Sequence, residues 1–450
     1  MGSTTDQKPI LILGAGLSGL LLAQYLRKTG SNRPVLIFER DADLATRGIG
    51  WGLTLHWSLP ALRSLLPEEL VQRLPEAYVD RAAVEQGRPS TFPFYDISTG
   101  ELKAKTPTAT ESHRIRVTRD RLRRLLATDL DIKWGKAVSS IKTGEDGTVT
   151  ASFDDGTSCE GCFAVACDGG SSRIRGLLFP EQQKHHIPVR LLGVRMDCTP
   201  EEIEPLRQLD PFFLQGAASE NDSFVYISVL DAPNNTPEGN GGKYSCQMVV
   251  SWPIRKGFFD QPEPIAFPDT NEGRIALIKT FAETWAEPFR TLALSIPSSS
   301  EVKSLDLYDW PPPKNLRTTG RVALVGDALH PMAMYRGEGA NHAIIDVLDL
   351  SEIVLPHLLS SETPAETASA QASSLRAALD RYEDTVVARA RPAVLASRQA
   401  CIDAHQWARI RDASPLLSRR AMHLTFDEAD MDAGALATSA SAEGVTGLVI

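Results

Sequence analysis

The most regular feature of the chain is a short apolar run that ends in a turn containing glycine, and it occurs three times. Residues 10–13 (ILIL) lead into GAGLSG at residues 14–19, and apolar residues at helical spacing follow. Residues 163–167 (FAVAC) lead into DGG, and residues 322–325 (VALV) lead into GD. Such runs predict buried parallel strands of an α/β fold, whose carboxyl ends share one edge of the sheet.

The first turn has the GxGxxG spacing of a dinucleotide-binding strand–turn–helix unit. Gly14 permits the tight turn, Gly16 lets a pyrophosphate approach the backbone, and Gly19 lets the helix pack close to the strand. The free N–H groups at the start of the helix attract phosphate. The predicted cofactor contacts in this turn are Gly14, Gly16, Leu17, Ser18 and Gly19.

A second apolar run, PVLIFER, ends in Glu39, twenty residues after Gly19. A carboxylate at this distance can accept both ribose hydroxyls of an adenosine. The N-terminal unit is therefore predicted to bind a cofactor that contains ADP. The alternative is a glycine-rich turn in an α/β protein that binds nothing.

The pattern changes between residues 181 and 304. Short, often alternating runs such as SFVYISVLD and YSCQMVVSWPI are divided by turns such as APNNTPEGNGG. Alternation with a period of two predicts an antiparallel sheet. The stretch EGRIALIKTFAETWAEPFRTLALS predicts a helix that is broken near Pro288.

The C-terminal part of the chain is predicted to be a linker, a helix and a tail. Residues 360–374 (SSETPAETASAQASS) have the low complexity of a linker. Apolar residues from Leu375 onward recur at helical spacing, which predicts an amphipathic helix that braces the first domain. The last residues, 427–450, lack both pattern and bulk and are expected to be mobile.

Composition narrows the classes of function. A chain of 450 residues with 42% hydrophobic and 23% charged residues is typical of a globular protein with two domains or one large insertion. The net charge of −10 argues against nucleic acid as a partner. The chain shows neither a signal peptide nor the roughly 18 consecutive apolar residues of a membrane span, so we expect no membrane association and a cytoplasmic location.

The six cysteines are scattered, and CEGC at residues 159–162 is the one suggestive spacing. A single CxxC without a second pair or nearby histidines is a weak indication of a metal or redox site. We expect ordinary thiols and no metal ion.

The three turns together resemble the flavoprotein aromatic hydroxylases, the family of single-component FAD-dependent monooxygenases. The resemblance rests on GxGxxG with Glu39, on Asp168-Gly169 and on Gly326-Asp327, and it includes the stretches RGIGWGLTLHWSLPALRSLLP and RVTRDRLRRLL. Within this family the chain is most similar to the fungal monooxygenases of secondary metabolism and to the tetracycline-modifying branch.

The resemblance implies an α/β fold with a Rossmann-like FAD-binding domain, an inserted antiparallel-sheet substrate domain and a C-terminal helix. The FAD-binding domain would comprise residues 1–180 and 305–359. The substrate domain would comprise residues 181–304, and the C-terminal helical segment residues 375–426, followed by the tail.

The resemblance also assigns roles to single residues. Asp327 would hydrogen-bond the ribityl chain of FAD, and Arg119 would contact the cofactor. Asp168 would contact the pyrophosphate region and a nicotinamide cofactor. The loop GEGAN, residues 337–341, would border the isoalloxazine ring and lead into a helix whose N-terminus stabilises a reduced, anionic flavin. The predicted contacts beyond the first turn are Glu39, Arg40, Arg47, Gly50, Arg119, Asp168, Asp327, Gly337, Gly339, Ala340 and Asn341.

The inserted sheet is expected to cover the flavin and to form the substrate pocket. No dense Lys/Arg cluster marks this segment, so an apolar aromatic or polycyclic substrate is expected. The candidate pocket residues are Trp57, Arg195, Tyr226, Met248, Trp252, Met334 and Tyr335. Aromatic residues on strands also pack sheets, so the alternative for each candidate is an ordinary core or surface residue, which is the commoner case.

The implied reaction uses FAD, NAD(P)H and dioxygen to hydroxylate or epoxidise a small molecule through a flavin C4a-hydroperoxide. Baeyer–Villiger insertion starts from the same species, and the chain offers no choice between NADH and NADPH and no indication of an oligomeric state. No side chain is predicted to act as acid or base, and His330 is interpreted as structural.

The chain departs from the family at one position. The family continues GDAAHPMxP after its third strand, whereas this chain has Met334 where the second proline stands. The departure leaves open a flavin enzyme that does not oxygenate, either an oxidative cyclase or a cyclase with structural FAD. A third reading is a binding protein without enzymatic activity.

Overall fold

The computed structural model describes residues 7–48, 50–233, 235, 241–359 and 368–431. It places the three predicted strands in one parallel sheet of five strands, in the order β17-β11-β1-β2-β7. The strands are buried because apolar layers cover both faces of the sheet. Their bounds are β1 (Ile10–Leu13), β2 (Val35–Phe38), β7 (Ile132–Lys133), β11 (Phe163–Ala166) and β17 (Val322–Leu324).

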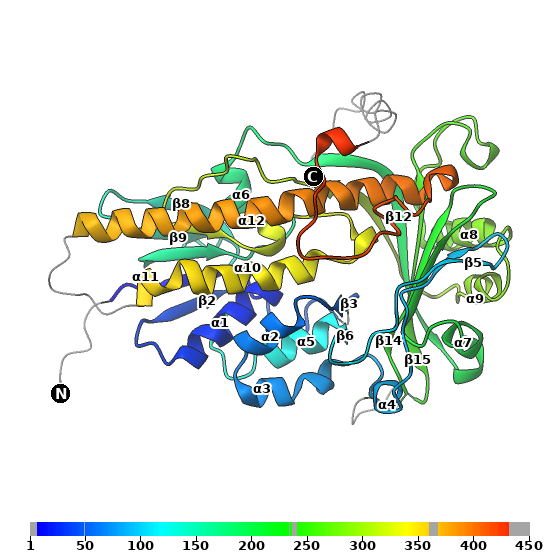
Figure 1. Ribbon diagram of the computed structural model, residues 1–450, viewed down its shortest axis with the longest axis horizontal. Helices are drawn as coiled ribbons and strands as arrows, with labels where there is room; N and C mark the ends of the chain where they lie inside the picture. Colours follow the sequence, from blue (N-terminus) through cyan, green and yellow to red (C-terminus); the bar gives the residue numbers. More distant parts are fainter. Residues whose placement is uncertain (1–6, 49, 234, 236–240, 360–367, 432–450) are drawn as a thin grey trace.

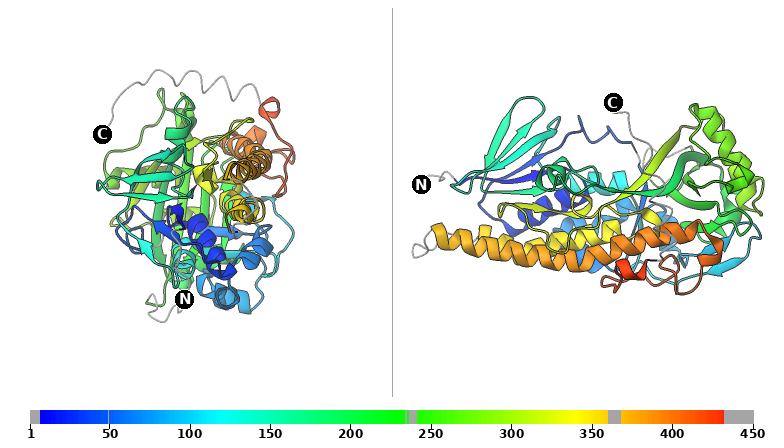
Figure 2. Two further views of the ribbon diagram at one scale, coloured as in Figure 1. Left: turned by 90° about the vertical axis from the view of Figure 1, so that its left-hand side faces the viewer. Right: turned by 90° about the horizontal axis from the view of Figure 1, so that it is seen from above.

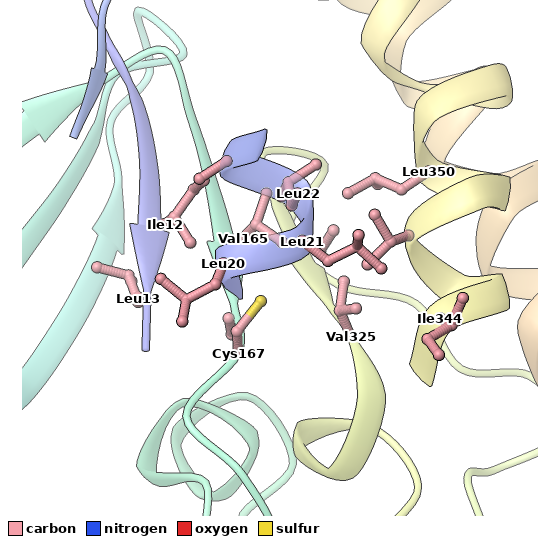
Figure 3. Close-up of a cluster of buried hydrophobic side chains, with 14 of the residues drawn as sticks. Ile12, Leu13, Leu20, Leu21, Leu22, Val165, Cys167, Val325, Ile344 and Leu350 are labelled. Atoms are coloured by element: carbon pink, nitrogen blue, oxygen red, sulfur yellow. The ribbon is translucent and has the colours of Figure 1, made fainter. Parts of the chain in front are cut away.

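Helices cover one face of this sheet and a three-stranded antiparallel sheet covers the other, as the view from above shows (Figure 2). Leu20 and Leu21 of the first helix and Ile344 of α10 meet Val165 and Val325 from the strands in a shared apolar cluster (Figure 3). The helices of this layer are α1 (Leu17–Thr29), α2 (Leu59–Leu65), α5 (Arg119–Leu126), α10 (Gly339–Ile353) and α12 (Ala368–Ala404). The opposite layer is β8 (Val138–Thr143), β9 (Val149–Phe153) and β10 (Ser158–Gly161).

A second sheet has seven strands in the order β16-β12-β15-β14-β13-β4-β5. Its strands are antiparallel except for β13 and β4, which pair in parallel, so the sheet is mixed. The bounds are β4 (Phe94–Asp96), β5 (Leu102–Ala104), β12 (His185–Cys198), β13 (Phe213–Ala217), β14 (Phe224–Asp231), β15 (Tyr244–Pro253) and β16 (Val302–Asp309).

The second sheet therefore extends beyond the predicted range 181–304. Strands β4 and β5 come from the first predicted segment, and β16 continues past residue 304. Alternation along a strand does not reveal which distant strand it pairs with, and the partner of β4 lies more than a hundred residues away in the chain.

Helices α7 (Pro200–Arg207), α8 (Asn271–Ala282) and α9 (Phe289–Leu294) cover the outer face of the second sheet (Figure 1). The predicted break near Pro288 is confirmed, since α8 ends before this residue and α9 begins after it. A two-stranded pair, β3 (Gly52–Leu55) and β6 (Ile115–Thr118), lies at the junction of the two halves. The remaining α-helices are α3 (Glu68–Gln72), α4 (Arg81–Glu85), α6 (Arg173–Leu178) and α11 (Leu355–Leu359).

Helix α12 runs along both halves of the molecule (Figure 1). Leu375, Leu379 and Tyr382 pack into the core beneath the parallel sheet, as the helical spacing predicts. Farther along, Ala400 and Cys401 pack against Leu191 of the second sheet, so the helix braces more than the first domain.

The predicted boundaries of this C-terminal region need correction. Helix α12 already begins at Ala368, within the predicted linker, and it ends at Ala404. From residue 405 to residue 431 the chain is largely irregular. Residues 360–367 and residues 432–450, which include most of the predicted tail, lie outside the described part of the chain. None of the described helices is both long and apolar enough to cross a lipid bilayer.

Candidate functional site

One large cavity, of about 470 Å³, lies between the carboxyl edge of the parallel sheet and the second sheet. The turns that follow β1, β2, β11 and β17 form its floor. Residues of β12, β13, β14 and β15 form its opposite wall. The structure therefore brings the turns at Gly14, Asp168 and Asp327 into one site, because parallel strands end at a common edge.

The glycines of the first turn have different structural roles. A Cβ atom at Gly14, where φ is +117°, would collide with the carbonyl of Cys167, and a Cβ atom at Gly19 would collide with the carbonyl of Gly14. A Cβ atom at Gly16 would meet nothing within 4 Å, because this residue faces the cavity. Gly14 and Gly19 are thus required by packing, whereas Gly16 leaves room for a ligand.

Glu39 holds the first turn from the end of β2. Its Oε2 accepts a hydrogen bond of 2.7 Å from the backbone N–H of Ala15, and its carboxylate lies 3.5 Å from Arg47 and 3.7 Å from Arg123. The side chain is buried but borders the cavity. A carboxylate has about four acceptor positions, so Glu39 can bind further hydroxyl groups.

Arg175 of α6 connects the DG and GD turns. Its guanidinium donates to the carbonyls of Asp327 at 3.0 Å and Ala328 at 2.9 Å, and to the carbonyl of Gly170 at 2.7 Å. Sequence reasoning assigned this residue no role, because a backbone acceptor leaves no trace in the amino-acid sequence.

The two aspartates of these turns face the cavity. Oδ1 of Asp168 is buried and accepts no hydrogen bond from any described residue. Burial raises the pKa of Asp168 and also raises that of Asp327, whereas the charges of His330, Arg119 and Arg175 act on Asp327 in the opposite direction. An unsatisfied buried acceptor of this kind is costly unless a ligand or water satisfies it.

Arg119, the first residue of α5, also lines the cavity. Burial lowers the pKa of its guanidinium, and the nearby Arg47 and Arg123 add to this effect. An anionic group in the cavity would relieve this repulsion.

Several further predicted cofactor contacts also line the cavity. Those that line the cavity are Leu17, Ser18, Arg40, Arg47, Gly337, Gly339 and Ala340. Gly337 belongs to the loop that enters α10, and Gly339 is the first residue of this helix, whose N-terminus the prediction directed at the flavin.

Three of the predicted contacts do not line the cavity. Gly19 packs α1 against the first turn, as described above, and Gly50 lies on the surface. Asn341 is fully buried, where its Oδ1 accepts hydrogen bonds from the N–H of His56 at 3.0 Å and from the hydroxyl of Ser58 at 2.8 Å. These bonds hold the segment after β3.

Strand register determines which residues of the second sheet face the cavity. Gly193, Val249, Tyr226 and Gln215 are successive partners across β12, β15, β14 and β13. The last three line the cavity. The indole of Trp51 occupies the space above Gly193, where a Cβ atom would collide with it.

Four of the predicted pocket residues lie outside the cavity, which corrects the expectation. Met248 and Trp252 of β15 are buried on the outer face of the sheet, against α8 and α9. Side chains alternate along a strand, so Val249 faces the cavity and its neighbour Met248 cannot. Arg195 lies near the far end of β12, where it donates to Ser245 at 2.7 Å with about half of its side chain exposed. Trp57 packs edge-on against His342 in the helical layer.

The other three predicted pocket residues, Tyr226, Met334 and Tyr335, line the cavity. Tyr335 is fixed by a hydrogen bond of 2.8 Å from its hydroxyl to Ser251 on β15. The loop that carries Met334 is anchored by a buried ion pair of 2.7 Å between Arg336 and Glu338, and Arg336 also donates to Ser418 at 2.9 Å. This anchoring restrains the loop at the position where the family has a proline.

Sequence reasoning missed several cavity residues on the second sheet and on β6, namely Arg116, Leu191, Gln215, Phe224, Gln247 and Val249. Val249 and Gln215 are cross-strand partners of Tyr226, and the guanidinium of Arg116 lies over its ring, so the tertiary structure identifies these residues. His330, which was interpreted as structural, is fully buried, and its Nε2 lies 2.6 Å from Asp346.

Comparison with known proteins identifies the family. Residues 7–219 match the family model described as "FAD binding domain". The chain is 42% identical to a probable FAD-dependent monooxygenase of the fungus Arthroderma benhamiae, over 96% of this chain and 99% of that protein. The chain belongs to the FAD-dependent monooxygenase family. It is therefore a flavoprotein oxidoreductase, and the family resemblance inferred from its motifs is confirmed.

Solved structures show the same fold. An FAD-containing monooxygenase from Photorhabdus luminescens superimposes with a TM-score of 0.66 at 23% identity, covering 89% of this chain and 99% of that chain. The tetracycline destructase Tet(55) superimposes with a TM-score of 0.56 at 17% identity, covering 90% of each chain. The predicted fold class, with a Rossmann-like sheet, a second sheet and a long C-terminal helix, is confirmed.

The residues of the cavity fit FAD. The open side of Gly16 and the N-terminus of α1 can accommodate a pyrophosphate, and Glu39 has free acceptor positions for ribose hydroxyls. The unsatisfied Oδ1 of Asp168 and the cavity-facing carboxylate of Asp327 offer acceptors for other hydroxyl groups of the cofactor. All six cysteines are free thiols, and the described residues contain no group of side chains suited to a metal ion.

Proposed function

We propose that this FAD-dependent monooxygenase uses NAD(P)H and dioxygen to hydroxylate or epoxidise an apolar aromatic or polycyclic small molecule in fungal secondary metabolism. The observation that carries the proposal is the single cavity that the cofactor turns share with the inner face of the second sheet. A small molecule that lies against this sheet would share a compartment with the cofactor.

The cofactor would be held by residues of the three turns. The first turn and Glu39 would bind the ADP part, and Asp327 would accept a hydrogen bond from the ribityl chain. Arg119 and the N-terminus of α10 would favour negative charge on the cofactor. Asp168 would bind the pyrophosphate region and the nicotinamide substrate. FAD supplies the redox chemistry, accepting a hydride from the nicotinamide and activating dioxygen.

The chain's own contribution is to orient the substrate and exclude water. Leu191, Phe224 and Val249 give the substrate side an apolar surface, and the fixed ring of Tyr335 closes it near the GD turn. Such a compartment suits a flat, apolar molecule, and exclusion of water protects reactive intermediates from hydrolysis. In this proposal no side chain transfers a proton to or from the substrate.

A second candidate function is a cyclisation on the same fold, either oxidative or with FAD as a structural group. It is motivated by Met334, which lines the cavity where the family has a proline. In this case the substrate would belong to the same apolar aromatic or polycyclic class, and no oxygen atom would enter the product.

Incubation of the purified holoprotein with NADPH, ¹⁸O₂ and a panel of hydroxylated naphthalenes and anthraquinones tests the proposal. We expect NADPH consumption stimulated by a substrate and one ¹⁸O atom in the product. A cyclised product without ¹⁸O and without NADPH consumption would favour the second function instead.

A further inference from the structure

Trp51 reaches across the cavity from the first half of the molecule to the second sheet. It precedes β3, and its carbonyl accepts a hydrogen bond of 3.1 Å from the backbone N–H of Arg119. The next residue, Gly52, donates its N–H to Oε1 of Gln247 on β15 at 3.2 Å. The backbone on either side of the Trp51 side chain is therefore fixed from both halves, and Trp51 lines the cavity.

Gly193 of β12 provides the space that the indole occupies. The atoms nearest to a Cβ atom at this position would be Cη2, Cζ3 and Cζ2 of Trp51, so the six-membered ring of the indole lies directly against the strand backbone. Glycine weakens the interior of a strand and often marks the close approach of another group. Trp51 also packs against the apolar cluster that contains Leu191 and Val249. Gly193 therefore permits a contact that any larger residue would prevent.

The inner face of β12 shows where the cavity ends. This face presents, in succession, Leu191, Gly193 and Arg195, because side chains alternate along a strand. Leu191 lines the cavity, and Gly193 lies beneath the indole. Arg195 does not line the cavity, and 51% of its side chain is exposed. Trp51 thus stands at the boundary between the substrate side of the cavity and the exposed end of β12.

The neighbouring strand β15 shows that the indole itself makes this boundary. Val249 and Gln247 of β15 both line the cavity. They are the cross-strand partners of Gly193 and Arg195, respectively. The cavity therefore continues along β15 past the level of Gly193, whereas on β12 the indole fills the corresponding space. Without the indole, the cavity would extend along β12 as it does along β15.

We propose that Trp51 determines the length of the substrate by closing the substrate side of the cavity at Gly193. The inference rests on the proposed function and deepens it, because it restricts the apolar aromatic or polycyclic class to molecules that end at the indole. A longer molecule would have to displace a side chain that packs against the strand backbone, at a cost typical of overpacking. A small side chain in place of the indole would extend the apolar compartment toward Arg195.

Two ligands that differ only in length test this inference by their binding. The probes are 2-naphthol and 6-phenyl-2-naphthol, and equilibrium dialysis against the oxidised holoprotein without NADPH gives the two dissociation constants. The phenyl group adds apolar surface, so it should tighten binding wherever the compartment has room for it. For the wild type we expect the opposite, with 6-phenyl-2-naphthol binding at least about tenfold more weakly than 2-naphthol.

Two substitutions at Trp51 and one elsewhere complete the test. Trp51→Ala should change the ratio of the two affinities by at least about tenfold in favour of the phenyl compound, and Trp51→Phe should give an intermediate ratio. Trp407→Ala is the matched control, because Trp407 is also partly buried and packs against the same apolar cluster but does not line the cavity. This control should keep the wild-type ratio. Far-ultraviolet circular dichroism and flavin content establish that each variant is folded.

The wild-type measurement alone can overturn the inference, so the test does not depend on the folding of Trp51→Ala. Equal or tighter binding of 6-phenyl-2-naphthol by the wild type would show that the compartment is not closed at Trp51. The same ratio in the wild type and in folded Trp51→Ala would place the limiting wall elsewhere and would also overturn it. If neither compound bound to the wild type, the apolar compartment would be absent and the inference would fail with it. Absence of ¹⁸O from the product, by contrast, would remove the proposed reaction but leave the discrimination by length intact.

Discussion

Arg389 on α12 donates a hydrogen bond of 2.7 Å to the carboxylate of Asp346 on α10, in the interior of the molecule. The other oxygen of Asp346 accepts from the backbone N–H of Gly326 at 2.7 Å and lies 2.6 Å from His330. Burial would raise the pKa of Asp346, but the charges of His330 and Arg389 hold it below its usual value. The C-terminal helix thus positions the turn that carries Asp327.

Asp346→Ala should therefore lower both the free energy of unfolding and the amount of flavin that the protein retains. Removing one partner leaves the buried Arg389 without its main counter-ion, for which a loss of about 3–5 kcal/mol in the free energy of unfolding is expected. Urea unfolding and the flavin content of the purified protein measure the two effects. The control is Asp384→Ala on α12, which removes an exposed ion pair with Arg317 and should cost at most about 1 kcal/mol. Equal losses in both variants would contradict the role of Asp346.

Substitutions at Gly16 and Gly19 should separate cofactor binding from packing. Gly16→Val places a side chain in the open cavity, so the apoprotein should fold with near wild-type stability but fail to retain FAD. Gly19→Ala drives a methyl group into the carbonyl of Gly14, so it should lower the melting temperature of the apoprotein as well. Retention of FAD by Gly16→Val would be hard to reconcile with a pyrophosphate at this turn.

Asp327→Ala should weaken FAD retention by about tenfold or more, because it removes a cavity-facing acceptor without disturbing the backbone contacts of the turn. Asp306→Ala is the control, since this carboxylate is 45% exposed on β16. Glu338→Ala is not a neutral control, because it would leave Arg336 buried without its ion-pair partner. Fluorescence titration of the apoprotein with FAD gives the dissociation constants, and equal values for Asp327→Ala and Asp306→Ala would count against the assignment.

The buried His405 should make the protein less stable in mild acid. Burial lowers the pKa of His405 from an ordinary value of 6.5 to about 4, while its Nδ1 lies 2.7 Å from the carbonyl of Cys401. The unfolded state therefore binds this proton more readily than the folded state. His405 leaves the free energy of unfolding unaffected above pH 6.5. As the pH falls toward 4, this residue lowers the free energy of unfolding by about 3 kcal/mol.

Urea unfolding of the wild type and of His405→Gln checks this contribution. It is measured from about pH 7.5 to about pH 4.5, a range that begins above the ordinary histidine pKa and ends near the lowered one. The variant should be less stable at neutral pH, where Ser251 loses its contact of 2.9 Å with His405 and keeps only that with Tyr335, but its stability should decrease less steeply. His113→Gln, at an exposed position, serves as the control substitution. Parallel pH profiles for wild type and His405→Gln would show that His405 does not cause the acid sensitivity.

Gly193→Ala should disturb the substrate side of the cavity through Trp51. The added methyl group collides with the indole, and overpacking of this kind typically costs about 1–3 kcal/mol. Thermal unfolding and the tryptophan emission spectrum should both change. Gly176→Ala is the control, because a Cβ atom there meets nothing within 4 Å. An unchanged emission spectrum in Gly193→Ala would mean that Trp51 does not sit over the second sheet in solution.

The amino-acid sequence by itself determined the parallel strands, the first turn and the break near Pro288. These features depend on residues that are close together in the chain, such as Gly14, Gly16 and Gly19, and their chemistry is local. The three turns were also sufficient to indicate the family, because a phosphate-binding turn and a carboxylate at a set distance leave a recognisable spacing.

Only the tertiary structure decided which side chains meet across the cavity. The pairing of β13 with β4 and the register that sets Val249 beside Tyr226 join distant parts of the chain, and a shift of one residue reverses the face of every side chain. Met248 was therefore placed on the wrong face, and Arg116 was not found. Contacts of this kind depend on packing between elements, which hydrophobic periodicity along one strand does not encode.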